Sequence, residues 1–188
     1  MPVATNYTAD AHGRPWRAEA TIAVVGAAAG GTAASVHADR IFGHLGNAHP
    51  YHHERGHLIG KQLGGDGSHV QNLVGLSDGT NAPLMADIEA LCAEIIRANP
   101  GGSVFLRVEV DWTNVNYNGP AVAPSVAGVA PWGVNGLPGG GTKGTVGAII
   151  VSIFSANPGL PAPATGALLW THGYPNGVVK NHAAAGCC

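Results

Sequence analysis

The chain has 188 residues, of which 29 glycines and 13 prolines form about a fifth, while charged residues account for only 11%. A hydrophobic content of 45% excludes an intrinsically disordered chain, which combines low hydropathy with high net charge. The formal charge of −2 excludes a basic surface that holds nucleic acid by bulk electrostatics. No apolar run is long enough for a membrane span, and we expect no signal peptide. We therefore predict one folded domain over residues 1–188.

The cysteines and histidines indicate which kinds of functional site the chain can form. The three cysteines, Cys92, Cys187 and Cys188, include no CxxC pair, so the sequence predicts neither a disulfide framework nor a thiolate zinc site. Ten histidines stand against nine lysines and arginines together. Histidine titrates near neutral pH and is the commonest metal ligand, so these residues are the first pointer to function.

The first half of the chain predicts short strands joined by turns. Residues 14–25 combine β-branched and aromatic side chains in partial alternation, which is typical of a strand. Residues 32–43 fit a strand or a helix, and both alternatives stay open. Residues 51–60 predict a short strand that carries polar side chains. Residues 64–67 are strong turn formers, and they indicate a backbone turn because no Lys-Ser/Thr pair follows as in a phosphate loop.

The second half predicts a helix between strands. Apolar residues over 83–97 recur at i, i+3, i+4 and i+7, the stripe of an amphipathic helix. Residues 103–112 alternate apolar and polar side chains as a strand does, and residues 146–154 predict a buried strand. Residues 118–145 form a long Gly/Pro-rich loop that is either functional or mobile, and we expect the tail at 183–188 to be disordered.

Six of the ten histidines fall between residues 44 and 89. Clustering of this kind suggests a metal, and one alternative is a zinc-binding module built from His44, His49, His52 and His53. No pair of histidines at helical spacing accompanies the cluster, so we prefer another interpretation.

That interpretation rests on the tetrapeptide ERGH at residues 54–57 and on three polar residues downstream of it. Asn72 comes next, Asn81 lies nine residues further on, and Glu89 eight residues after that. The amphipathic helix begins beside Asn81, and a strand comes after the helix. This order resembles the DNA/RNA non-specific endonuclease family, the ββα-metal or His-Me finger nucleases, whose Asp-Arg-Gly-His signature is present here as Glu-Arg-Gly-His. The resemblance covers roughly residues 50–112 and implies an α+β fold with a ββα-metal core set in a larger antiparallel sheet.

The resemblance implies a metal-dependent, sugar-non-specific endonuclease that hydrolyses DNA and RNA and leaves 5′-phosphate and 3′-hydroxyl ends. His57 is then the general base, since an imidazole can accept a proton from water at neutral pH. Asn81 is the metal ligand, because an amide oxygen suits a hard cation such as Mg²⁺, with Mn²⁺ as the alternative ion. The cation stabilises the charge on the phosphoryl and leaving oxygens.

The resemblance also assigns supporting residues. Glu89, about two helical turns beyond Asn81, is near enough to hold metal-bound water and to assist catalysis. Asn72 orients the loop or a water. Arg55 contacts phosphate or braces the site, and both roles stay open. His53, beside the motif, is a candidate substrate contact.

Two positions depart from the family pattern. Glu54 replaces the usual Asp, so the carboxylate that supports the metal site is one methylene longer. Pro83 disfavours helical geometry at Ala82, so we expect the helix to begin late and Asn81 to lie at its N-terminal end, where the helix dipole favours a phosphate. Asn81 is also a good helix cap, and both roles can hold at once.

The resemblance implies DNA and RNA substrates bound through the phosphate backbone, and no membrane partner. It fits a protein that is secreted or delivered to another cell, as a toxin with a cognate immunity or inhibitor protein or as a secreted nuclease. Two rivals are the zinc module and an inactive nuclease fold that binds metal or nucleic acid. The presence of His57, Asn81 and Glu89 argues against the inactive nuclease fold.

Overall fold

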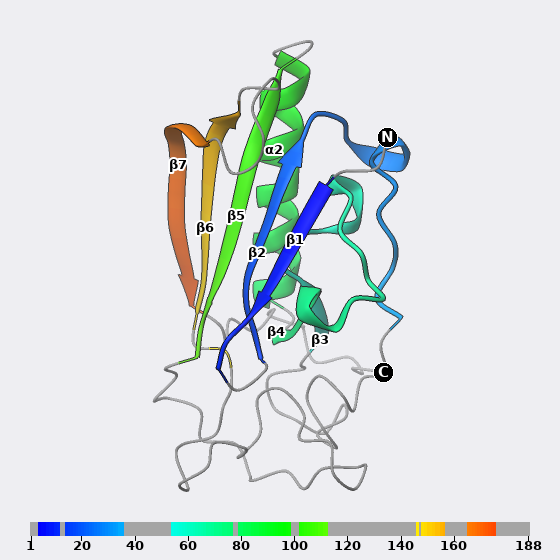
Figure 1. Ribbon diagram of the computed structural model, residues 1–188, viewed down its shortest axis with the longest axis vertical. Coiled ribbons are helices and arrows are strands. Elements are labelled where there is room, and N and C mark those ends of the chain that lie inside the picture. Colours follow the sequence, from blue (N-terminus) through cyan, green and yellow to red (C-terminus); the bar gives the residue numbers. More distant parts are fainter. Residues whose placement is uncertain are drawn as a thin grey trace, which may run out of the picture.

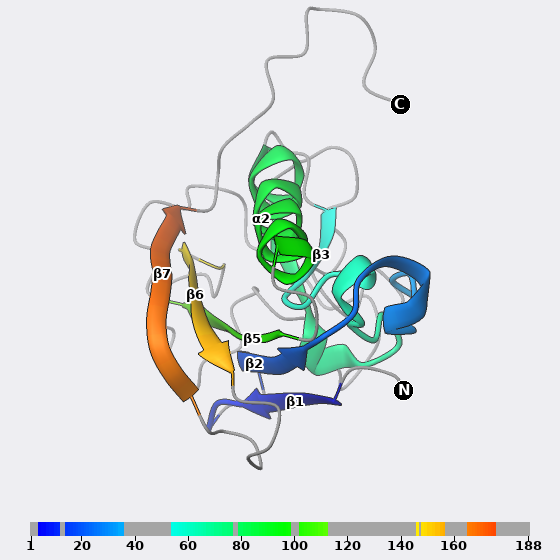
Figure 2. The ribbon, with the colours of Figure 1, turned by 90° about the horizontal axis from the view of Figure 1, so that it is seen from above.

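The architecture is a curved antiparallel sheet with one long helix on its inner face (Figures 1 and 2). The computed structural model describes residues 4–11, 14–35, 54–76, 79–98, 102–112, 146, 148–156 and 165–175. The sheet has the order β1-β2-β5-β6-β7, and a separate two-stranded sheet pairs β3 with β4. The α+β class with a ββα unit beside a larger antiparallel sheet is therefore confirmed.

The five strands of the large sheet pair antiparallel with their neighbours. Their bounds are β1 (Ala4–Ala9), β2 (Pro15–Ile22), β5 (Ser103–Asp111), β6 (Ala148–Ala156) and β7 (Thr165–Pro175). The strands predicted over 14–25, 103–112 and 146–154 are confirmed as β2, β5 and β6. The two edge strands, β1 and β7, were not predicted, because neither alternates apolar and polar residues cleanly.

The ββα unit consists of β3 (Glu54–His57), β4 (Leu73–Leu76) and α2 (Met85–Ala98), in that order. Short turns connect these elements: η3 (Lys61–Leu63) and η4 (Val70–Asn72) before β4, and η5 (Thr80–Leu84) before α2. A further turn, η1 (Gly26–Ala29), comes after β2. Figure 2 shows β3 and β7 on opposite sides of α2.

The structure describes only some of the other segments for which the sequence made a prediction. Residues 32–35 form neither helix nor strand, and residues 36–43 lie outside the described part. The Gly/Pro-rich segment 118–145 and the tail 183–188 also lie outside it. No helix within the described ranges is long and apolar enough to span a membrane.

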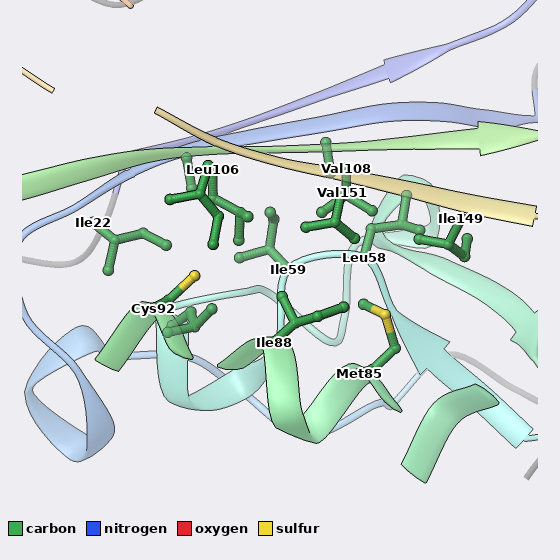
Figure 3. Close-up of a cluster of buried hydrophobic side chains, with 14 of the residues drawn as sticks. Ile22, Leu58, Ile59, Met85, Ile88, Cys92, Leu106, Val108, Ile149 and Val151 are labelled. Carbon is green, nitrogen blue, oxygen red and sulfur yellow. The ribbon is translucent and has the colours of Figure 1, made fainter. Parts of the chain in front are cut away.

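The core lies between α2 and the inner face of the large sheet (Figure 3). Met85, Ile88 and Cys92 point from α2 toward the sheet, and Leu58 and Ile59 from the loop after β3 fill the space between. Burial raises the pKa of the Cys92 thiol to about 12, and the charge of Glu89 acts in the same direction, so Cys92 stays protonated and packs as an apolar residue.

The outer face of the sheet carries cross-strand ion pairs. Arg17 on β2 lies opposite Glu109 on β5, with 2.8 Å between Arg17 Nη2 and Glu109 Oε1. Two residues along, Arg107 Nε lies 2.8 Å from Glu19 Oε1. Opposite charges in register on one face stabilise the pairing of β2 with β5, and they make the two faces of the sheet chemically distinct.

Leu106 is the position at which to test the packing of the core, because it is 1% exposed at the centre of β5. We expect Leu106→Ala to lower the free energy of unfolding by about 2–5 kcal/mol, through lost burial and the cavity left behind. Leu169→Ala on β7 is the control, since Leu169 is 50% exposed and its truncation should cost about 0.5 kcal/mol or less. Urea unfolding monitored by circular dichroism measures both. Equal losses in the two variants would contradict this packing.

Candidate active site

His57 ends β3, and the loop after it is held by Asn72, the last residue of η4. The pairing of β3 with β4 sets His57 opposite Leu73. Next in the chain, the backbone N–H of Leu58 donates to the carbonyl of Asn72 over 2.8 Å. The Asn72 side chain is fully buried and bonds both backbone groups of Ile59: its Oδ1 accepts from Ile59 N, and its Nδ2 donates to Ile59 O. Asn72 Nδ2 also donates to the carbonyl of Asp66, so this side chain fixes the path of the loop after His57.

Asn81 occupies the kinked turn at the start of α2. Ala82 has φ −149° and ψ 121°, which is extended rather than helical, as expected of the residue before Pro83. The late helix start is therefore confirmed. The Asn81 side chain donates from Nδ2 to the carboxylate of Glu54, across to β3, so its hydrogen bond goes to that carboxylate and caps no helix N–H. Within the described residues, the Asn81 Oδ1 atom accepts no hydrogen bond.

Glu89 lies one turn into α2 and packs on the backbone at Gly60. A Cβ at Gly60 would overlap the Glu89 carboxylate, so a larger residue there would displace that carboxylate. Gln62 Nε2 donates to Glu89 Oε2 over 2.5 Å. Burial raises the pKa of Glu89 above its ordinary value, and the hydrogen bond from Gln62 acts in the opposite direction.

His57, Asn81 and Glu89 all line one cavity of about 570 Å³. Its lining comes from the segment after β2, the end of β3, the turn η3 and the start of α2. These lining residues are Gly26, Gly31, His57, Lys61, Gln62, Asn81, Met85, Ala86 and Glu89. The structure therefore brings His57, Asn81 and Glu89 together around one cavity.

The imidazole of His57 is held by a backbone carbonyl. Its Nε2 lies 3.2 Å from the carbonyl oxygen of Thr32, which can only accept, so Nε2 carries the proton. In the neutral ring the lone pair is then on Nδ1. Burial lowers the pKa of His57 below its ordinary value of 6.5, the Thr32 carbonyl raises it, the charge of Arg55 lowers it, and that of Asp66 raises it.

Thr32 is itself fixed by the loop that contains Asp66. Its backbone N–H donates to the carbonyl of Gly65 over 3.0 Å, and its hydroxyl donates to Asp66 Oδ1 over 3.1 Å. The same hydroxyl accepts from the N–H of Gly67 over 2.8 Å. Asp66 Oδ1 also accepts from the N–H and hydroxyl of Ser68, which lowers the pKa of Asp66 and keeps it charged. These bonds, which we call the Thr32 clamp, hold the carbonyl that orients His57.

The other candidate residues that the structure describes do not line the cavity. Arg55 is half-buried on β3, does not line the cavity and acts on His57 through its charge. Asn72 does not line it either, and its contacts fit the loop-orienting role. His69 is exposed, and its Nδ1 accepts from Gln71 N at the start of η4. His53 lies outside the described residues.

The donor atoms in the cavity suit a hard cation. The Asn81 amide oxygen and the Glu89 carboxylate are oxygen donors, which Mg²⁺ prefers over nitrogen or sulfur. Across the described ranges, no three His, Cys, Asp or Glu side chains lie close enough together to hold a metal by themselves. The four histidines of the zinc-module alternative lie outside these ranges. A cation at Asn81 would therefore complete its shell with water and substrate oxygen.

Sequence reasoning missed Thr32, Lys61 and Gln62. Thr32 lies far before the motif, and only the folded chain brings its carbonyl to His57. Lys61 and Gln62 come directly after the motif, so their proximity to His57 was the available signal.

Comparisons with known proteins gave one family match and several similar folds. A family model described as DNA/RNA non-specific endonuclease matches residues 3–129. Among solved structures, NucA from Streptococcus agalactiae with magnesium ion bound is 16% identical, covers 94% of this chain and 73% of its own, and has a TM-score of 0.57. The Sda1 nuclease with bound zinc ion is 15% identical, with coverages of 95% and 75% and a TM-score of 0.52. At these identities the likeness shows the fold alone. No curated protein gave a match.

Asp66→Asn tests the electrostatics around the base. The amide oxygen can keep accepting from Thr32 and Ser68, so the change removes mainly charge. Since the negative charge of Asp66 favours the imidazolium form, its loss should lower the pKa of His57 further. NMR titration of the His57 ring measures the shift. Asp87→Asn is the control, because Asp87 acts on Tyr174, and it should leave the His57 titration unchanged. A rise in the pKa of His57 in Asp66→Asn would contradict this arrangement.

Proposed function

Because the chain belongs to the DNA/RNA non-specific endonuclease family, we propose that it hydrolyses phosphodiester bonds of DNA and RNA with His57 as general base and a Mg²⁺ ion at Asn81. One observation carries the proposal: the imidazole of His57, the amide oxygen of Asn81 and the carboxylate of Glu89 line one cavity although they come from separate elements. Intact placement of all three also argues against an inactive nuclease fold.

In this mechanism His57 takes the proton of the attacking water. The Thr32 carbonyl holds the proton of Nε2, so the neutral ring presents the lone pair of Nδ1 to that water. The lowered pKa keeps the ring neutral, and therefore able to accept a proton, at pH 7. The Thr32 clamp limits rotation of the ring, which is the role of the orienting partner of a catalytic histidine.

Asn81 would bind the cation through Oδ1, and Glu89 would hold a water of its coordination shell. When bound, the cation supplies positive charge to the phosphoryl and leaving oxygens. Glu54 supports this by accepting from Asn81 Nδ2, which directs the amide oxygen away from that carboxylate and leaves it available. The oxygen donors favour Mg²⁺, with Mn²⁺ as the alternative, over zinc, which prefers nitrogen and sulfur ligands.

The proposal extends to substrates and setting. Substrates are bound through the phosphate backbone, with Arg55 and His53 as further contacts, and residues 1–188 form one nuclease domain. Two similar structures carry the descriptions "extracellular endonuclease" and "extracellular nuclease", and they support secretion or delivery to another cell. A toxin nuclease with a cognate immunity protein is one form of this proposal.

The direct test is cleavage of plasmid DNA and a long RNA with Mg²⁺, with EDTA, and by His57→Ala. We expect degradation of both polymers by the wild type, and a loss of about 100-fold or more in His57→Ala because general-base catalysis contributes that much. EDTA should abolish cleavage. His172→Ala, an exposed histidine on β7, is the matched control and should stay active. No cleavage by the wild type with Mg²⁺ or Mn²⁺ would contradict the proposed function.

The lowered pKa of His57 determines the expected pH dependence. The ring is neutral above that pKa and gains a proton as the pH falls through it, so kcat/KM should be flat near neutrality and fall in acid, with its midpoint below 6.5. A pH profile of kcat/KM with a short oligonucleotide measures the midpoint, and unfolding curves at each pH exclude denaturation as the cause. A midpoint above 6.5 would show that the folded site stabilises the imidazolium instead.

A further inference from the structure

The cavity is lined by a basic residue, Lys61, to which the proposed mechanism gives no role. Among the described residues that line it, Lys61 alone carries a permanent positive charge. His57 is neutral at pH 7 because its pKa is lowered, and Glu89 contributes negative charge when ionised. A phosphodiester entering this cavity brings a further negative charge, so the side chains other than Lys61 offer it no compensation.

Among the described residues, nothing binds the ammonium group of Lys61, whereas three of the arginines are held in ion pairs. Arg14, Arg17 and Arg107 each form an ion pair with a carboxylate. Lys61 is exposed, and within the described part of the chain no ion pair or hydrogen bond engages its ammonium. With a formal net charge of −2 the chain has no general basic surface, so a single free cation in the cavity matters for an anionic ligand.

The backbone of Lys61, unlike its side chain, is fixed. Its carbonyl accepts from the N–H of Gly64 over 3.1 Å, and Gly64 has φ 93°, a conformation that favours glycine. Gly31 packs so closely on the same carbonyl that any side chain there would collide with it. The turn η3 therefore presents Lys61 at a constant place, four residues after His57, on a flexible stem that can follow a phosphate.

We propose that Lys61 is the phosphate-binding residue of the cavity, which pairs with a non-bridging oxygen of the substrate backbone. This inference rests on the proposed function for its substrate. It adds a contact to phosphate that depends on neither the base nor the sugar. Lys61 would then serve DNA and RNA alike, by charge, and act chiefly on binding.

The test measures the salt dependence of binding. In the His57→Ala background with Mg²⁺, affinity for a fluorescent DNA duplex is followed by anisotropy over a range of salt concentrations. Each phosphate contact contributes about 0.9 to the slope of log K against log salt. We expect Lys61→Ala to lower the magnitude of the slope by about 0.9 and to weaken binding several-fold, and Lys61→Arg to restore both.

Arg97→Ala is the matched control. It removes the same charge from an exposed side chain in the last turn of α2, about 18 Å along the helix from Met85, and should leave the slope unchanged. An unchanged slope in Lys61→Ala, or an equal loss in Arg97→Ala, would overturn the assignment. Cleavage by the wild type is scored separately, so failure of the proposed function is distinguished from failure of this contact. In otherwise wild-type protein, Lys61→Ala should raise KM more than it lowers kcat, and the reverse would also overturn the assignment.

Discussion

The site depends on side chains that pack against bare backbone at two glycines, Gly56 on β3 and Gly60 in the loop after it. Gly56 on β3 has no room for a Cβ because Leu76 and the Asn81 amide oxygen lie against it, and Gly60 has none because of the Glu89 carboxylate. A side chain at Gly56 would displace Leu76 or the Asn81 amide, and one at Gly60 would displace the Glu89 carboxylate from its place in the cavity. Since His57 lies between these glycines in sequence, they let the side chains of Asn81 and Glu89 approach the segment that carries His57.

Much of the fold could be predicted because burial leaves a periodic pattern. The apolar stripe of α2 and the alternation in β5 arise from one buried face each, and both elements were found with bounds close to those observed. The edge strands were missed for a physical reason: β7 keeps Leu168 and Leu169 exposed, so its pattern does not alternate with burial. Local sequence could not show that β1 and β7 complete the sheet, since that pairing depends on which strands come together in the folded chain.

The candidate site was predictable where its residues lie close to one another in sequence. The family resemblance carried by the ERGH motif and the residues after it indicated His57, Asn81 and Glu89, and Pro83 indicated the late start of the helix. The carbonyl of Thr32 was not predictable, because a backbone group has no signature in sequence and reaches His57 only through the folded Thr32 clamp. Local sequence therefore indicates the candidate side chains better than the backbone groups that orient them.

The proposed chemistry depends most on a cation bound by Asn81 in the cavity beside His57. The most direct measurement is a crystal structure of His57→Ala with Mn²⁺ and a short oligonucleotide, with the ion located by its anomalous scattering. We predict one ion bound to Asn81 Oδ1, with waters and a phosphate oxygen as its other ligands. An ion bound instead by histidines such as His44 and His49, with the cavity empty, would contradict this mechanism.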